Sequence, residues 1–180
     1  SEAPQAQFLW AIHRDAWHYA AVILADIAET ARDADFAMRW GYGWKQGLFE
    51  TWQAAGWKQV AGWIEEDIAA GKAMSDVPLP AWVNEIEAVH TPAGSYAPEA
   101  GAYRPHSDLP VYRRQYFPET VLGEATGDPG ETIYENDGVR MWRQGGEDIA
   151  ILSFKSKMHA VGEAVIEGIN QALDIAEERF

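Results

Sequence analysis

Hydrophobic positions in the first 30 residues recur at steps of three and four, the spacing that lines up one face of an α-helix. Pro4 stands just ahead of this pattern, as it does at many helix starts. The sequence therefore predicts one long helix over residues 5–30. We expect its apolar face to consist of Phe8, Ile12, Ala16, Ala20, Ile23, Leu24 and Ile27.

Similar patterns predict further helices over 33–40, 47–54 and 57–70, and a short one that starts near Pro80 and turns Trp82, Val83 and Ile86 to one side. Glycines separate them, at positions 41, 43 and 56, and Gly71 is a candidate C-cap. The segment 38–63 is rich in tryptophan and glycine. We expect its glycines to permit tight helix crossings, and its large aromatic side chains to fill the space between the helices. The side chains expected to be mostly buried are Trp40, Phe49, Trp52 and Trp63.

The pattern changes after residue 90. Six of the nine prolines fall between 91 and 130, which predicts a linker or a wrapped loop. Within it, residues 94–105 could form a small hairpin that carries Tyr96 and Tyr103.

After residue 130, alternating apolar and polar positions predict antiparallel strands over 132–136, 139–144 and 148–154, joined by turns at Asp137-Gly138 and Gly145-Gly146. A last helix is expected over 160–180, with its apolar face made of Val161, Val165, Ile169, Ala172, Leu173 and Ala176. The predicted fold is mainly α, with a helical domain over 1–90, a Pro-rich connector over 91–130 and a small β-meander plus helix over 131–180.

The composition narrows the classes of function. Apolar residues make up 47% of the 180 residues, enough for a folded core, and the net charge of -14 opposes binding to nucleic acid or anionic membranes. No apolar run is long enough for a membrane span. The absence of cysteine excludes disulfides and thiolate zinc sites, and fits a cytoplasmic location.

Few motifs in the chain suggest chemistry. The stretch Gly41–Gly47 has a Gly-x-Gly pattern, but a nucleotide fingerprint needs a strand before it and two residues between its second and third glycines. Here a helix is predicted to precede it and three residues intervene, so we expect the stretch to be structural and to bind no nucleotide.

The histidines and acidic clusters suggest no catalytic or metal site. His13 and His18 are five residues apart, which does not suit metal ligands on one helical face. His90 and His106 lie in or beside the connector without a ligand partner at a known spacing. The sequence PHSD at 105–108 is expected to be a solvated loop, because neighbours in sequence rarely form a catalytic triad. The sequence EED at 65–67 is expected to be the wet face of a helix.

One loop could serve catalysis. Residues 155–159 connect a predicted strand to a predicted helix, and backbone N–H groups in such loops can stabilise an oxyanion. Lys155 and Lys157 add positive charge there, although most loops of this kind have no chemical role.

The sequence DADFAMRWGYGWKQGLFETWQAAG, residues 33–56, resembles the signature of the C-terminal helical domain of 3-hydroxyacyl-CoA dehydrogenases. Leu48 replaces the usual proline and Gln53 the usual aspartate, which suggests the second copy of this domain in a duplicated protein, where it supports the enzyme instead of touching substrate. The matching residues are Asp35, Ala37, Met38, Gly41, Gly43, Gly47, Phe49, Glu50 and Gly56.

Residues 139–180 look like the first strands and first helix of a crotonase-type enoyl-CoA hydratase domain. By this resemblance, SKMHAV at 156–161 matches a loop that supplies one oxyanion-hole N–H. Lys157 would supply that backbone N–H, and His159 occupies an asparagine-like position.

The order of the two resemblances is similar to that of the bacterial multifunctional fatty-acid oxidation protein. The resemblance implies a non-catalytic fragment of a β-oxidation enzyme that oxidises 3-hydroxyacyl-CoA with NAD and hydrates enoyl-CoA. It implies no cofactor in this chain, NAD in the parent enzyme, and as partners the remaining domains of that enzyme or a second copy in a homodimer. Acyl-CoA would bind only the full protein. The alternative is an autonomous Trp-rich helical module for protein interaction or dimerisation.

Overall fold

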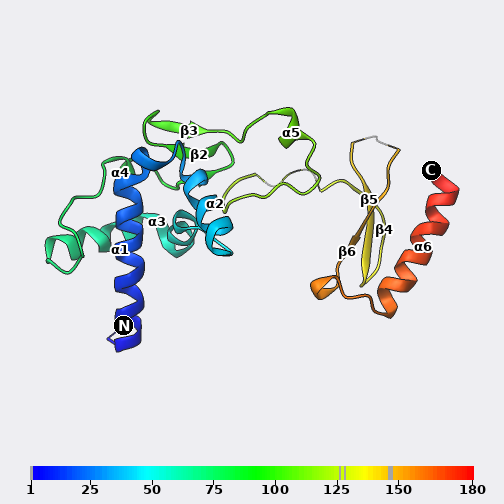
Figure 1. Ribbon diagram of the computed structural model, residues 1–180, viewed down its shortest axis with the longest axis horizontal. Helices are drawn as coiled ribbons and strands as arrows, with labels where there is room; N and C mark the ends of the chain where they lie inside the picture. Colours follow the sequence, from blue (N-terminus) through cyan, green and yellow to red (C-terminus); the bar gives the residue numbers. More distant parts are fainter. Residues whose placement is uncertain (1, 126, 128, 146–147) are drawn as a thin grey trace. The chain divides into compact units, whose positions relative to one another are not determined.

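The computed structural model describes residues 2–125, 127, 129–145 and 148–180, and the chain divides into two compact units, Ser1–Ala125 and Thr126–Phe180. Roughly half of the chain is helical, and the strands form two small antiparallel sheets. The fold is therefore a mixture of α and β (Figure 1). The segment 91–125 belongs to the first unit.

The first unit contains three main helices and one small sheet of strand order β1-β2-β3. Tyr96 pairs with Tyr103 across β2 and β3, which confirms the hairpin expected there. The elements are α1 (Pro4–Ile27), α2 (Ala31–Tyr42), α3 (Leu48–Ala69), α4 (Trp82–Glu85), β1 (His90–Thr91), β2 (Gly94–Ala97), β3 (Ala102–Arg104) and α5 (Pro110–Arg113).

Local capping sets the helix ends. Thr30 caps α2 and forms a reciprocal capping box with Asp33, so α1 ends before Thr30 and α2 begins earlier than expected. Gly56 has φ 103° and kinks α3, which confirms the break between two helical segments. Gly71, with φ 67°, follows the end of α3 as a left-handed residue, as expected.

The core of the first unit is built on stacked aromatic rings. Phe49 and Trp52 are fully buried, and Trp52 stacks on Trp57 with ring centroids 4.3 Å apart. The expected burial of Trp40 and Trp63 is wrong, because their side chains are 70% and 45% exposed. Trp40 lies at the end of α2 and is held by a hydrogen bond to Glu119 instead of by the core.

The expected apolar face of α1 is also wrong in part. Phe8, Ile12 and Ile27 are exposed, and the buried side chains of this helix are Arg14, Trp17, His18, Ala20, Ala21 and Leu24. The side of α1 that carries Trp10, Arg14 and Trp17 contacts α3, and Phe8 and Ile12 lie on the opposite side of the helix. Arg14 can be buried because it pairs with Asp15 and Asp67, both at 2.9 Å.

The second unit is an antiparallel sheet of order β4-β5-β6 with a helix packed on it, as expected. A Cβ on Gly168 would meet the Val139 side chain at 2.3 Å, so helix and sheet approach closely at that glycine. Leu173 and Val161, expected to be inward, are exposed. Gly146 of the expected turn lies outside the described residues. The elements are β4 (Glu131–Glu135), β5 (Val139–Arg143), β6 (Ile151–Phe154), η1 (Lys157–His159) and α6 (Glu163–Arg179).

Within the described part of the chain, none of the helices combines the length and the apolar character that a membrane span requires.

Candidate functional site

The residues of the glycine- and tryptophan-rich segment converge on the carboxylate of Asp35. This side chain is fully buried and accepts the backbone N–H groups of Phe49 at 2.8 Å and Glu50 at 2.9 Å. Both amides belong to the first turn of α3, where no intrahelical acceptor exists. Asp35, which lies on α2, therefore caps the N-terminus of α3, and a negative charge there interacts favourably with the helix dipole.

Glu50 completes the same helix start. One of its carboxylate oxygens accepts the backbone N–H of Gly47 at 2.8 Å, and the other accepts that of Leu122 at 2.9 Å. Arg39 lies 3.7 Å from the first of these oxygens and balances its charge. A Cβ on Gly47 would lie 2.3 Å from the Asp35 carboxylate and 2.4 Å from its Cα, so Gly47 permits the close approach of α2 to this turn.

His90 links Asp35 to the small sheet. Its Nε2 lies 2.8 Å from Asp35 Oδ2, and its Nδ1 lies 2.8 Å from Ser95 Oγ. Burial raises the pKa of Asp35, and the hydrogen bonds from His90 and Phe49 act in the opposite direction. The three side chains tie α2 to β1 and β2.

Serine, histidine and aspartate in this hydrogen-bonded order are the residue types of a catalytic triad. The exposed fractions of Ser95 and His90 are 1% each, and that of Asp35 is 0%, so no substrate carbonyl can reach the serine oxygen. The arrangement is structural: it satisfies buried polar groups and fixes the packing of the helices against the sheet.

Gln53 extends this network to the end of the Pro-rich segment. Its side-chain oxygen accepts the backbone N–H groups of Val89 and His90, and its nitrogen donates to the carbonyls of His90 and Leu122. Arg32 adds bonds to Glu124 at 2.6 Å and to the Glu119 carbonyl at 2.7 Å. Residues 119–124 are thus fastened to α2 and α3.

Substitutions at two glycines test the close approach of α2 to the start of α3. Gly47→Ala is expected to lower the free energy of unfolding by about 1–3 kcal/mol, since the new methyl group overlaps Asp35. Gly41→Ala is the matched control, because Gly41 lies inside α2 with no atom near its would-be Cβ and should gain about 0.5–1 kcal/mol. Chemical unfolding measures both, and equal effects of the two substitutions would contradict the close approach at Gly47.

The remaining sequence candidates do not assemble into a site. His13 is exposed and stacks on Trp17, His18 is buried against the Val77 carbonyl, and His106 is exposed as expected. Of the acidic run 65–67, Asp67 is not solvated: its carboxylate accepts the N–H groups of Trp10 and Arg14. The described residues contain no group of three or more His, Cys, Asp or Glu side chains that could hold a metal ion.

The Gly41–Gly47 stretch connects α2 to α3, and no strand precedes it, so it lacks the context of a nucleotide fingerprint. A Cβ at Gly41 or at Gly43 would meet open space. These two glycines therefore do not allow close backbone contacts, contrary to expectation; Gly43, with φ 67°, ends α2.

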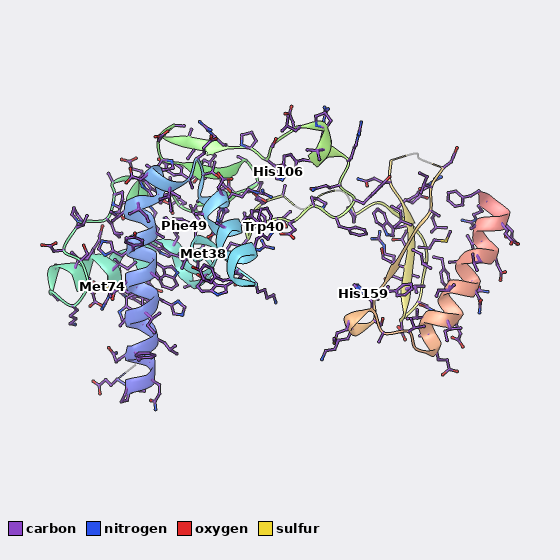
Figure 2. All side chains as sticks on the ribbon, viewed as in Figure 1. Met38, Trp40, Phe49, Met74, His106 and His159 are labelled. Atoms are coloured by element: carbon purple, nitrogen blue, oxygen red, sulfur yellow. The ribbon has the colours of Figure 1, made fainter. Side chains whose placement is uncertain are left out.

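Lys157 lies at the start of η1, with its side chain exposed. Met158 and His159 beside it have φ of 57° and 54°, in the left-handed region that residues other than glycine rarely adopt. Among the described residues, the backbone N–H of Lys157 has no hydrogen-bond partner. Figure 2 marks His159 in this loop.

The sequence did not reveal the roles of His90, Ser95 and Gln53. They lie 55, 60 and 18 residues from Asp35 in the chain, and their hydrogen bonds follow from the fold. A partial signal existed for Gln53, which stands where the resembled signature carries aspartate.

The signature residues thus form a buried hydrogen-bond network in a helical unit, and no accessible catalytic group lies at its centre. Comparison with curated proteins shows 28% identity over 191 aligned positions to a protein of Bacillus subtilis (strain 168) described as a probable 3-hydroxyacyl-CoA dehydrogenase. The similarity covers the whole of this chain and 22% of that protein. No family profile and no solved structure matches the chain. The chain is thus distantly similar to this protein and spans about a fifth of its length.

Proposed function

We propose that this chain is a non-catalytic part of a longer 3-hydroxyacyl-CoA dehydrogenase and supports the packing of its domains. The observation that carries the proposal is the agreement between the dehydrogenase-like signature and the buried network: Asp35, Gly47, Phe49 and Glu50 all serve to join α2 to α3. The distant relative in Bacillus subtilis supports the same family over the full length of the chain.

In this proposal the longer enzyme oxidises 3-hydroxyacyl-CoA with NAD, and the residues for that chemistry lie outside these 180 positions. The β-meander and α6 are the first elements of a crotonase-like domain that hydrates enoyl-CoA. Lys157 supplies one oxyanion-hole N–H there, which is supported by its unpartnered amide in a strained strand-to-helix loop.

Activity measurements on the purified 180-residue chain test this proposal. We expect no NADH formation from a 3-hydroxyacyl-CoA and NAD, and no hydration of crotonyl-CoA, above the rate of a blank without protein. A complete dehydrogenase and a complete hydratase are the positive controls. Turnover that co-purifies with the chain, and is absent from a mock purification, would contradict the non-catalytic role.

The alternative of a Trp-rich interaction module has one supporting observation. Trp40, Tyr42 and Trp44 are 70%, 72% and 45% exposed near the end of α2, although Phe49 in the same segment is fully buried (Figure 2). The signature segment therefore combines a structural core with an aromatic surface, and the two roles are compatible within one domain.

A further inference from the structure

A cleft between α1 and α3 has the chemistry of a cation site. It has a volume of about 330 Å³ and is lined by Ala6, Gln7, Trp10, Trp63, Glu66 and Asp67; we call it the tryptophan cleft. The rings of Trp10 and Trp63 meet edge to face, with centroids 5.8 Å apart. The Trp10 indole N–H donates to Asp67 at 2.8 Å, which fixes the orientation of that ring.

The carboxylates of the cleft differ in availability. Asp67 is already engaged, since the same oxygen also accepts Arg14 at 2.9 Å. Glu66 is exposed and has no ion-pair partner among the described residues. Indole faces next to an unpaired carboxylate attract a guanidinium, which combines cation–π contact with charge-assisted hydrogen bonds.

A segment of the same chain offers such a group. Residues 105–118 contain Arg113, Arg114 and one acidic residue, Asp108, in a chain whose net charge is -14. Arg113 and Arg114 are exposed, and among the described residues their guanidinium groups have no ion-pair or hydrogen-bond partner. Beside them Leu109, Val111 and Tyr112 are 55%, 64% and 41% exposed. We call residues 105–118 the arginine loop.

The arginine loop cannot fill the cleft of its own unit. Arg104 is bonded to Glu29 at 2.8 Å before the loop, and Glu119 and Glu124 are bonded to Trp40 and Arg32 after it. Figure 1 shows α5, which belongs to the loop, at the opposite end of this unit from the first turns of α1 that line the cleft. The loop therefore lies away from the cleft of its own unit.

We propose that the arginine loop of one copy of this chain docks into the tryptophan cleft of a second copy, with a guanidinium against Trp63 and Glu66. Charge complementarity favours a second copy, because the loop is a basic segment of an acidic chain and the cleft is apolar and acidic. Two copies can exchange loops reciprocally, which gives a closed dimer with two equivalent contacts. Exposed tyrosine and arginine side chains are the types that dominate such interfaces.

Charge reversal on each side tests the contact. The loop variant carries Arg113→Glu and Arg114→Glu, and the cleft variant carries Glu66→Lys. Sedimentation equilibrium of the unmodified chain is expected to show a mass approaching twice the monomer's 20.0 kDa as concentration rises. Each variant alone places like charges in both contacts and is expected to stay monomeric.

The decisive experiment is sedimentation equilibrium of a mixture of the two variants. In a heterodimer the reversed loop faces the reversed cleft and the native loop faces the native cleft, so both contacts are restored and the dimer mass returns. A control variant with Lys157→Glu and Arg179→Glu makes the same change in charge in the other unit, and is expected to dimerise like the unmodified chain. A monomeric unmodified chain, no dimer in the mixture, or loss of the dimer in the control would each overturn the proposal.

A synthetic peptide of residues 104–119 gives an independent readout. We predict that adding this peptide to the chain shifts the indole N–H signals of Trp10 and Trp63 in ¹H–¹⁵N spectra. The signal of the buried Trp52 is expected to stay in place. A peptide with Arg113→Glu and Arg114→Glu is the matched control and is expected to cause no shift. Equal shifts with both peptides, or none with either, would contradict binding of an arginine in the cleft.

Discussion

Replacing Asp35 by alanine is expected to lower the free energy of unfolding by about 3–5 kcal/mol, because it breaks a buried hydrogen-bond network and leaves several polar groups without a partner. The substitution leaves the amides of Phe49 and Glu50 and one nitrogen of His90 without an acceptor, all of them away from water. Chemical unfolding of the first unit, followed by tryptophan fluorescence, gives the value.

Asp26→Ala is the matched control for this prediction. Asp26 is an exposed aspartate on α1, so its replacement is expected to change the free energy of unfolding by less than about 0.5 kcal/mol. A similar small loss for Asp35→Ala would show that its carboxylate does not hold α2 and α3 together.

Replacing Trp52 by alanine is expected to cost about 3–5 kcal/mol, as for other large aromatic side chains removed from a core. Trp52 is fully buried, stacks between Trp17 and Trp57, and donates its indole N–H to the Trp57 carbonyl at 3.1 Å. Alanine leaves a cavity in the middle of this stack, which the rigid rings on either side cannot close.

Trp40→Ala is the matched control in the same unfolding measurement, because it removes the same type of side chain from an exposed position. The Trp40 side chain is 70% exposed, and its indole N–H donates to Glu119 at 3.0 Å at the surface. We expect a loss below about 1 kcal/mol, the usual range for surface positions. Losses of equal size at Trp40 and Trp52 would contradict the described core.

The sequence predicted the elements better than the faces they bury. Turn glycines and period-two alternation located β4, β5 and β6, and the three- and four-residue steps located α1 and α6. The predicted apolar face of α1 was wrong because a second set of residues at helical spacing, Trp10, Arg14 and Trp17, contacts α3 instead. Phe8 and Ile12 lie on the opposite side of the helix and are exposed.

The site at Asp35 could be predicted only in outline. Asp35, Gly47 and Glu50 were singled out as residues of the resembled signature, and in the structure they lie together at the start of α3. The contribution of His90 depends on a contact between residues 55 positions apart, and no local pattern encodes such a pairing. A buried histidine and a loop histidine look alike in a single sequence.

Native-state hydrogen exchange at the amides of Phe49 and Glu50 tests the central claim most directly. First-turn amides of a helix lack intrahelical acceptors and ordinarily exchange quickly, so slow exchange there requires another acceptor. The structure supplies one in the Asp35 carboxylate, at 2.8 Å and 2.9 Å. We predict that both amides exchange as slowly as the core of α3, and that Asp35→Asn speeds at least one of them. Rapid exchange of both amides in the unmodified chain would contradict the account.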